Sequence, residues 1–216
     1  MSKKVKILLS KNNQLEKQIS LDSKLVMTDI VVYLRGANIS EYQQEVIRQD
    51  ILQMVIDGEQ RGTEIKDVIG EDYQSFCDQI INEVPKLNKG QRCLYAVRDG
   101  CLYFGILIAI WAGFGAVEML KNNSLYIWVT AGDIISICMC ILAAMVIVGI
   151  ITKKSFDETF VKGKQMHALF IGALSICIIT AVLFTQRVFE VHVVILGAVL
   201  LILAALYKIM DGRLAG

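Results

Sequence analysis

The sequence predicts an all-α protein, in which a small cytoplasmic helical domain (residues 1–85) precedes a four-helix transmembrane bundle (residues 101–216). The bundle is predicted from four apolar stretches, because each has about the ~20 residues that a helix needs to cross a bilayer. The first hundred residues contain no such stretch. Apolar residues make up 55% of the chain, above the ~45–50% usual in soluble domains. The predicted spans are residues 102–120, 134–152, 166–184 and 191–210.

The first domain alternates between helical patterns and turn signals, and the only proline, Pro85, closes it. We expect a first helix at about 11–19 and a second at about 23–35. Ser40 begins a third helix, and Gln43, three residues later, can complete a capping box with it. The apolar residues of this third helix fall three and four apart, which predicts one buried face.

The end of the domain is predicted to hold one brief turn and one longer helix. Thr63 is placed to cap the turn, which Gly70 stops. The last helix starts near Glu71, whose charge suits the positive end of the helix dipole. Its apolar residues form a stripe that is expected to face the core: Tyr73, Phe76, Cys77, Ile80, Ile81 and Val84.

A short motif marks the start of this last helix. Gly70, Asp72, Phe76, Cys77 and Asp78 form the pattern G-x-D-x-x-x-F-C-D after a three-helix lead-in. Over residues 10–85 the chain resembles a bacterial family of small all-helical domains of unknown function with this signature. It is also loosely similar to the HAAS-type helical signalling domains that precede membrane segments in some Gram-positive proteins. The resemblance implies an interaction domain rather than an enzyme, and the motif residues are expected to be structural.

Lysines and arginines predict the orientation of the spans, because they accumulate in cytoplasmic loops. Three segments are basic: residues 86–100, the loop between the second and third spans, and the segment after the fourth. The other two loops hold only Lys121 and Arg187. Four passes put all three basic segments on one side, so both termini are expected in the cytoplasm at a bacterial inner membrane. Residues 86–100 form a basic linker that either lies on the anionic leaflet or lengthens the first helix.

Ionisable residues near the outer ends of the spans form a candidate polar cluster. Its members are Glu118, Asp133, Glu190 and His192. Burial of a charged group in a bilayer costs free energy, so the presence of these four residues near the spans suggests a functional site. The cluster could bind a cation or a cationic peptide, or respond to pH through His192, whose ordinary pKa is ~6.5. The competing interpretation places each residue in the wet headgroup zone without a special role.

Several classes of protein find no support in the sequence. The formal net charge of +1 gives no basis for nucleic-acid binding. Cys138 and Cys140 lie about 200° apart around a helix, so they cannot chelate one metal ion. The nucleotide, dinucleotide, zinc and hydrolase motifs that carry enzyme chemistry do not occur. We therefore expect no catalytic residue, no metal and no cofactor.

These observations predict a non-enzymatic integral membrane protein whose cytoplasmic domain binds a protein partner in a signalling, regulatory or transporter-accessory role. The partner would be a cytosolic regulator or a membrane transporter subunit, and the lipid bilayer is the other expected partner. Small residues four apart, such as Ala168 and Gly172, would also allow a homo-oligomer. The alternative is a small oligomeric transporter or channel component, with Asp133 and Glu118 near its pathway.

Overall fold

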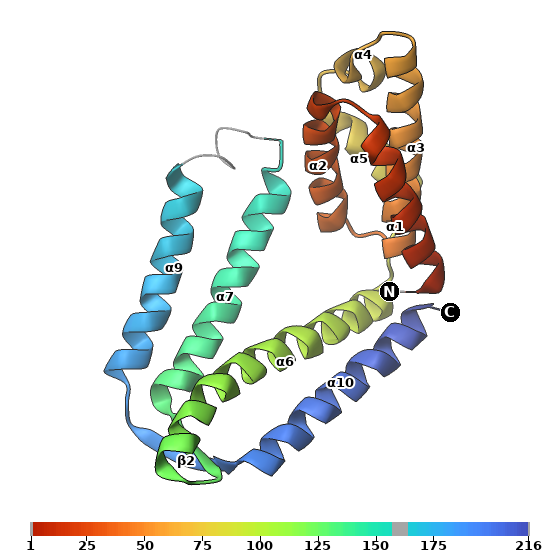
Figure 1. Ribbon diagram of the computed structural model, residues 1–216. Helices are drawn as coiled ribbons and strands as arrows, with labels where there is room; N and C mark the ends of the chain where they lie inside the picture. Colours follow the sequence, from red (N-terminus) through yellow and green to blue (C-terminus); the bar gives the residue numbers. More distant parts are fainter. Residues whose placement is uncertain (1, 157–163, 216) are drawn as a thin grey trace. The chain divides into compact units, whose positions relative to one another are not determined.

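The computed structural model of the protein describes residues 2–156 and 164–215 (Figure 1). Most of the chain is helical, with 80% in helices and 6% in strands. It folds as two compact units. The first is built from residues 2–92 and 148–156, and the second from residues 93–147 and 164–214.

The first unit is a set of short helices. They are α1 (Lys3–Leu15), the 3-10 turn η1 (Glu16–Gln18), α2 (Leu21–Gly36), α3 (Glu41–Gln60), α4 (Ile65–Ile69) and α5 (Tyr73–Glu83). The prediction of a first helix at 11–19 is wrong, because the hydroxyl of Ser2 caps the chain earlier by accepting the backbone N–H of Val5 at 3.2 Å. The prediction that Thr63 caps the brief turn is also wrong, since α4 begins after Glu64 without a side-chain cap.

Local capping chemistry elsewhere in this unit follows the sequence. The Ser40 hydroxyl accepts the Gln43 backbone N–H and the Gln43 side chain accepts the Ser40 backbone N–H, each at 3.2 Å. The predicted capping box is thereby confirmed. Gly70 adopts φ +88°, a conformation that residues with a Cβ rarely adopt. Asp72 then caps α5 by accepting the Ser75 backbone N–H at 2.9 Å.

The hydrophobic core of the first unit lies between α2, α3 and α5. Its most deeply buried side chains are Met27, Ile30, Leu34, Ile51, Leu52, Val55 and Cys77. Aromatic rings close one side of this core, because the ring of Phe156 lies 5.2 Å from that of Tyr33 and 6.3 Å from that of Tyr73. Burial of each large apolar side chain contributes about 1.5–3 kcal/mol, so these contacts are the main source of the domain's stability.

The second unit is built around long apolar helices. They are α6 (Lys89–Asn122), α7 (Ala131–Lys153), α9 (Lys164–Leu183) and α10 (Val193–Ala215). In the part of the chain that the structure describes, three helices are long and apolar enough to cross a membrane. They are Lys89–Asn122, Ala131–Thr152 and Val193–Leu214, with mean hydropathies of 1.9, 3.0 and 2.6.

The prediction of four full-length spans needs correction at the third span, residues 166–184. The corresponding apolar helix, His167–Leu183, is shorter than the other three. The whole helix, α9, runs over 20 residues from Lys164 to Leu183, and it ends one residue before the predicted end of the span.

The all-α prediction is wrong at two short segments, which pair as a two-stranded antiparallel sheet. The strands are β1 (Tyr126–Thr130) and β2 (Arg187–His192), with Tyr126 opposite His192 and Trp128 opposite Glu190. Both strands are rich in valine and aromatic residues, which favour extended backbone. The fourth predicted span, 191–210, consequently begins later, at Val193, because the two residues before it pair in β2.

The basic linker predicted at residues 86–100 is helical from Lys89 onward, where α6 starts and continues into the first apolar span. This geometry corresponds to the interpretation in which the linker lengthens the first helix. The short stretch ahead of it is tied back to the helical domain, because the Leu87 backbone N–H donates to the Asn38 carbonyl at 3.0 Å. Little slack is therefore left between α5 and α6.

Candidate functional site

Asp133, the carboxylate that the sequence singled out in the second span, is engaged in a helix cap. Its Oδ2 accepts the backbone N–H of Thr130 at 2.8 Å and the Thr130 hydroxyl at 2.7 Å. The Asp133 backbone N–H donates to the same hydroxyl oxygen at 3.2 Å. This reciprocal pair satisfies orphan groups at the start of α7, so the structure gives Asp133 a local structural role.

Glu190 and His192 lie on β2, where they face aromatic residues of β1. The ring of His192 meets that of Tyr126 edge-on, with centroids 5.0 Å apart. Glu190 is paired in register with Trp128. The guanidinium of Arg187 lies 4.7 Å from the Trp128 ring centroid, a cation–π contact. The side chain of Glu118 lies outside the described residues, so the proposed cluster of four is only partly brought together.

The described residues contain no group of three or more histidine, cysteine, aspartate or glutamate side chains that could hold a metal ion. The sheet end of the second unit carries aromatic and polar side chains in contact with one another.

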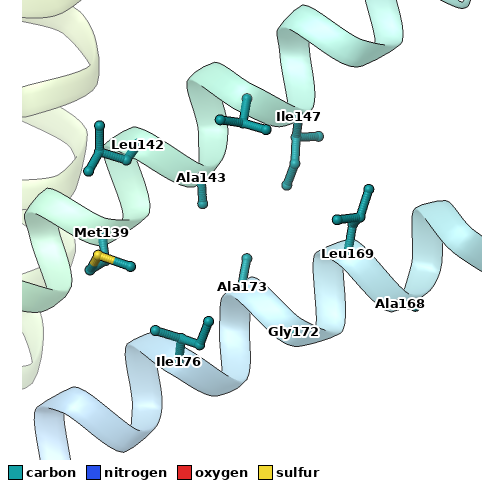
Figure 2. A pocket seen from close by; sticks show the side chains of 10 residues that line it. Met139, Leu142, Ala143, Ile147, Ala168, Leu169, Gly172, Ala173 and Ile176 are labelled. Atoms are coloured by element: carbon teal, nitrogen blue, oxygen red, sulfur yellow. The ribbon is translucent and has the colours of Figure 1, made fainter.

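The second unit also holds an apolar groove between α7 and α9, of about 630 Å³ (Figure 2). At one end the helices meet, because Gly132 donates its backbone N–H to the Phe184 carbonyl at 2.7 Å and the hydroxyls of Ser136 and Thr180 lie 2.9 Å apart. Beyond that end the apolar side chains of the two helices face each other across an open space. The groove is lined by Met139, Leu142, Ala143, Val146, Ile147, Ala168, Leu169, Gly172, Ala173 and Ile176. Such a surface suits lipid chains or another apolar helix.

In the helical domain, Gly70 lies at the end of α4 and Asp72 caps the start of α5. Cys77 is fully buried, and this burial raises the pKa of its thiol to about 12. The carboxylate of Asp78 accepts a hydrogen bond from the Tyr33 hydroxyl at 2.7 Å. Burial and this hydrogen bond raise the pKa of Tyr33 to about 12. Phe76 packs half-buried against the same core.

A second groove, of about 460 Å³, lies between α1 and α2 above α3. In Figure 1 these two helices run side by side in opposite directions. The walls come from residues spaced three or four apart on each helix, and Arg48 of α3 forms the floor. The lining residues are Leu9, Asn13, Glu16, Thr28, Val31, Val32, Arg35 and Arg48.

The floor of this groove is held by a network of buried charges. Arg48, only 6% exposed, forms ion pairs with Glu16 and Glu45, and donates to the Asn13 side chain at 3.0 Å. Asn12 donates to the Glu45 carboxylate at 2.9 Å and to the Glu45 carbonyl at 2.8 Å. Such networks fix a unique packing when their members are paired. In this network the buried Nε of Arg48 and Oδ1 of Asn12 have no hydrogen-bond partner among the described residues, so its polar groups are only partly satisfied.

Sequence reasoning missed this groove, which joins three helices that are separated along the chain. The one available signal was the pair of opposite charges three residues apart in α3, Glu45 and Arg48. A pair with that spacing is usually an exposed ion pair on a helix surface. Only the approach of α1 turns it into a buried network.

Comparison with protein-family models, curated proteins and solved structures finds no match for this chain. The resemblance of residues 10–85 to a family of small helical domains therefore stays a prediction.

Proposed function

We propose that this is a non-enzymatic membrane protein whose helical domain binds a protein partner in the groove between α1 and α2. The groove itself carries the proposal. Its volume of about 460 Å³ lies in the range of about 300–1,000 Å³ typical of binding pockets. It combines half-buried apolar walls with a charged floor that is already fixed by its own ion pairs. A groove of this kind suits recognition of another chain, in a signalling, regulatory or transporter-accessory role.

The apolar helices would anchor this domain in a bacterial inner membrane, with both termini cytoplasmic. The pairing of β1 with β2 supports four passes, since it brings the connection between α6 and α7 beside the connection between α9 and α10. Both connections then lie on one side of the bilayer. If α7 crosses to the other side, α9 has to return, in spite of its shorter apolar length. With four passes, the basic segments predicted to be cytoplasmic would all fall on the side opposite the sheet.

Orientation can be tested with a thiol reagent that does not cross membranes. Intact cells would be labelled at Asn123→Cys, which lies in the turn before β1, while native Cys93 near the start of α6 would stay unlabelled until the membrane is opened. Labelling of Cys93 in intact cells would contradict the cytoplasmic placement of the helical domain.

Partner binding can be tested by crosslinking the full-length protein in native membranes and identifying what co-purifies. The control is a chain that lacks residues 1–85 but still inserts. We expect a specific protein to be recovered with the full chain and lost with the control. Recovery of the same proteins with both chains would overturn the proposal.

The alternative, a small oligomeric transporter or channel component, gains no support from Asp133, because its carboxylate is bound to Thr130. The apolar groove between α7 and α9, with Ala168 and Gly172 in its wall, would be the surface for self-association in that case. Reconstituted ion flux that is abolished by Asp133→Asn, a change that keeps the capping geometry, would favour this alternative.

A further inference from the structure

We propose that the groove between α1 and α2 selects an acidic segment of its protein partner, in which carboxylate side chains flank one or two apolar anchors. This inference rests on the proposed function and adds the chemistry of the partner.

The lining residues define one face on each helix. On α1 they are Leu9 and Asn13, and Glu16 follows directly in η1. Successive residues of an α-helix are about 100° apart, so Lys6 lies within about 80° of this face, at its edge. Lys11, by the same geometry, lies on the opposite side of the helix. Lys17 is the exposed residue that follows Glu16 in η1. The rim of the groove on α1 and η1 therefore carries positive charge at both of its ends.

The facing side of α2 repeats the pattern. Lys24 lies one turn before Thr28 on the lining face, and Arg35 closes the other end of the groove. Because α1 and α2 run in opposite directions (Figure 1), Lys6 lies toward the end that holds Arg35. Lys17 lies toward the end that holds Lys24. Basic side chains thus bracket the groove at both ends.

The negative charge on the groove is already engaged. Glu16, the acidic residue among its lining side chains, forms an ion pair with Arg48 of the floor. Arg48 is in turn shared with Glu45. Lys24 is half-buried and close enough to Glu59 for its charge to help lower the pKa of that carboxyl. Lys6, Lys17 and Arg35 are exposed, and a partner with carboxylates near them would complement their charge.

The middle of the groove is apolar. Leu9, Val31 and Val32 are half-buried there, between the basic ends. A short apolar side chain of the partner can cover them, and burial contributes about 25 cal/mol per Å² of apolar surface removed from water. Along its length the groove therefore has a basic end, an apolar middle and a second basic end. A complementary segment of the partner would have acidic residues on both sides of an apolar residue.

The competing occupant of a basic surface on a membrane protein is the anionic leaflet of the bilayer. A flat bilayer would engage the outward lysines of α1, including Lys11, as strongly as those at the groove. It would leave the recessed side chains of Leu9 and Val32 uncovered. The concave shape therefore favours a protein segment, and the two occupants differ in their dependence on Lys11.

The first arm of the experiment places a photocrosslinking amino acid at Val32 in the full-length protein in cells, with Lys11 as the matched control position. The crosslinked segment is then sequenced by mass spectrometry. We expect a protein segment of net negative charge from Val32 and not from Lys11. Crosslinks from Val32 only to phospholipid, or to a segment of neutral or positive charge, would overturn the inference.

The second arm measures binding of that segment, as a synthetic peptide, to the full-length protein in nanodiscs of neutral lipid. Lys6→Glu combined with Arg35→Glu should weaken the affinity for the peptide about tenfold or more. Lys11→Glu changes the charge at its site by the same amount as Lys6→Glu, but should leave the affinity within about twofold of the wild-type value. Continued burial of Cys77 against alkylation would verify that each variant is folded. Equal losses with Lys6→Glu and Lys11→Glu would overturn the inference.

The two proposals fail in different ways. A partner that needs residues 1–85 but binds equally well to the Lys6→Glu, Arg35→Glu variant contradicts the acidic-groove inference alone. The absence of any partner that depends on residues 1–85 contradicts the proposed function itself.

Discussion

The hydroxyl of Ser23 donates a hydrogen bond of 2.6 Å to Oε1 of Glu59, and so ties the first turn of α2 to the last turn of α3. The same carboxylate accepts the backbone N–H of Ser20, at 3.0 and 3.1 Å to its two oxygens. Partial burial would raise the pKa of Glu59, but the hydrogen bonds from Ser23 and Ser20 outweigh it and lower the pKa below its ordinary 4.5.

We predict that Glu59→Gln lowers the stability of the helical domain by about 1 kcal/mol at neutral pH, the typical value of a hydrogen bond to a side chain. Because the pKa of Glu59 is lowered by folding, its contribution is present above pH 4.5 and is lost as the pH falls through the folded value. The difference between wild type and variant should therefore shrink in acid. Hydrogen–deuterium exchange of α2 and α3 peptides, at about pH 7 and about pH 3.5, measures it.

Glu64→Gln is the matched control for this prediction. Glu64 forms an ion pair with Lys66 at 2.8 Å, and both side chains are exposed, so its loss should change stability little. Equal effects of the two variants, or a Glu59 effect that grows in acid, would contradict the assigned role.

Thiol reactivity should separate the two cysteines of the N-terminal region. Cys77 is fully buried and its thiol pKa is raised to about 12 by burial, whereas Cys93 is exposed. Because the thiolate is the reactive form, maleimide at neutral pH should modify Cys93 and leave Cys77 intact until denaturant opens the domain. Mass spectrometry of the labelled full-length protein tests this, and rapid labelling of Cys77 without denaturant would contradict the buried position.

The buried charges below the groove give a prediction about unpaired groups. Arg48→Met leaves the buried carboxylate of Glu45 without its ion-pair partner, which should destabilise the domain by about 3 kcal/mol. Adding Glu45→Gln removes the orphaned charge and should recover much of the loss. The denaturant concentration at which Cys77 becomes reactive measures both effects. A double variant less stable than Arg48→Met alone would contradict the ion-pair account.

A close backbone approach at the sheet end of the second unit gives the last prediction. A Cβ at Gly132 would lie 2.8 Å from the Phe184 carbonyl oxygen and 2.9 Å from that of Thr180. Gly132→Ala should therefore lower the thermal stability of the protein in detergent, since backbone atoms cannot move aside as a side chain can. At Gly197 nothing lies within 4 Å of such a Cβ, so Gly197→Ala is the matched control. Equal melting temperatures of the two variants would show that α7 and α9 separate freely there.

Several features of the helical domain could be predicted because their causes are local. The Ser40 and Gln43 capping box needs only two residues three apart. Gly70 and Asp72 end one helix and begin the next through their own backbone and side-chain preferences. The length of the apolar stretches predicted four spans, and three helices in the described part of the chain are long and apolar enough to cross a membrane. In each case the neighbours along the chain supply the interaction.

The features that escaped prediction depend on distant pairing. Residues 187–192 adjoin a long apolar stretch, and nothing in their sequence alone distinguishes them as a strand. They form one because β1, about 60 residues earlier in the chain, supplies their hydrogen-bond partners. From the sequence, Asp133 is a charged residue whose burial in a span would be costly. In the structure its carboxylate accepts hydrogen bonds from Thr130, at the end of β1.

The sequence by itself determined where apolar helices form, the caps at Ser40 and Asp72, the turn at Gly70, and which segments are basic, because these follow from composition and from residues within one or two turns. Only the tertiary structure decided that Arg48 lies buried between Glu16 and Glu45, and that α1 and α2 leave a groove between them. Both depend on the packing of three separate helices. A one-dimensional pattern does not specify which polar faces are brought together, since that is set by the geometry of the whole core.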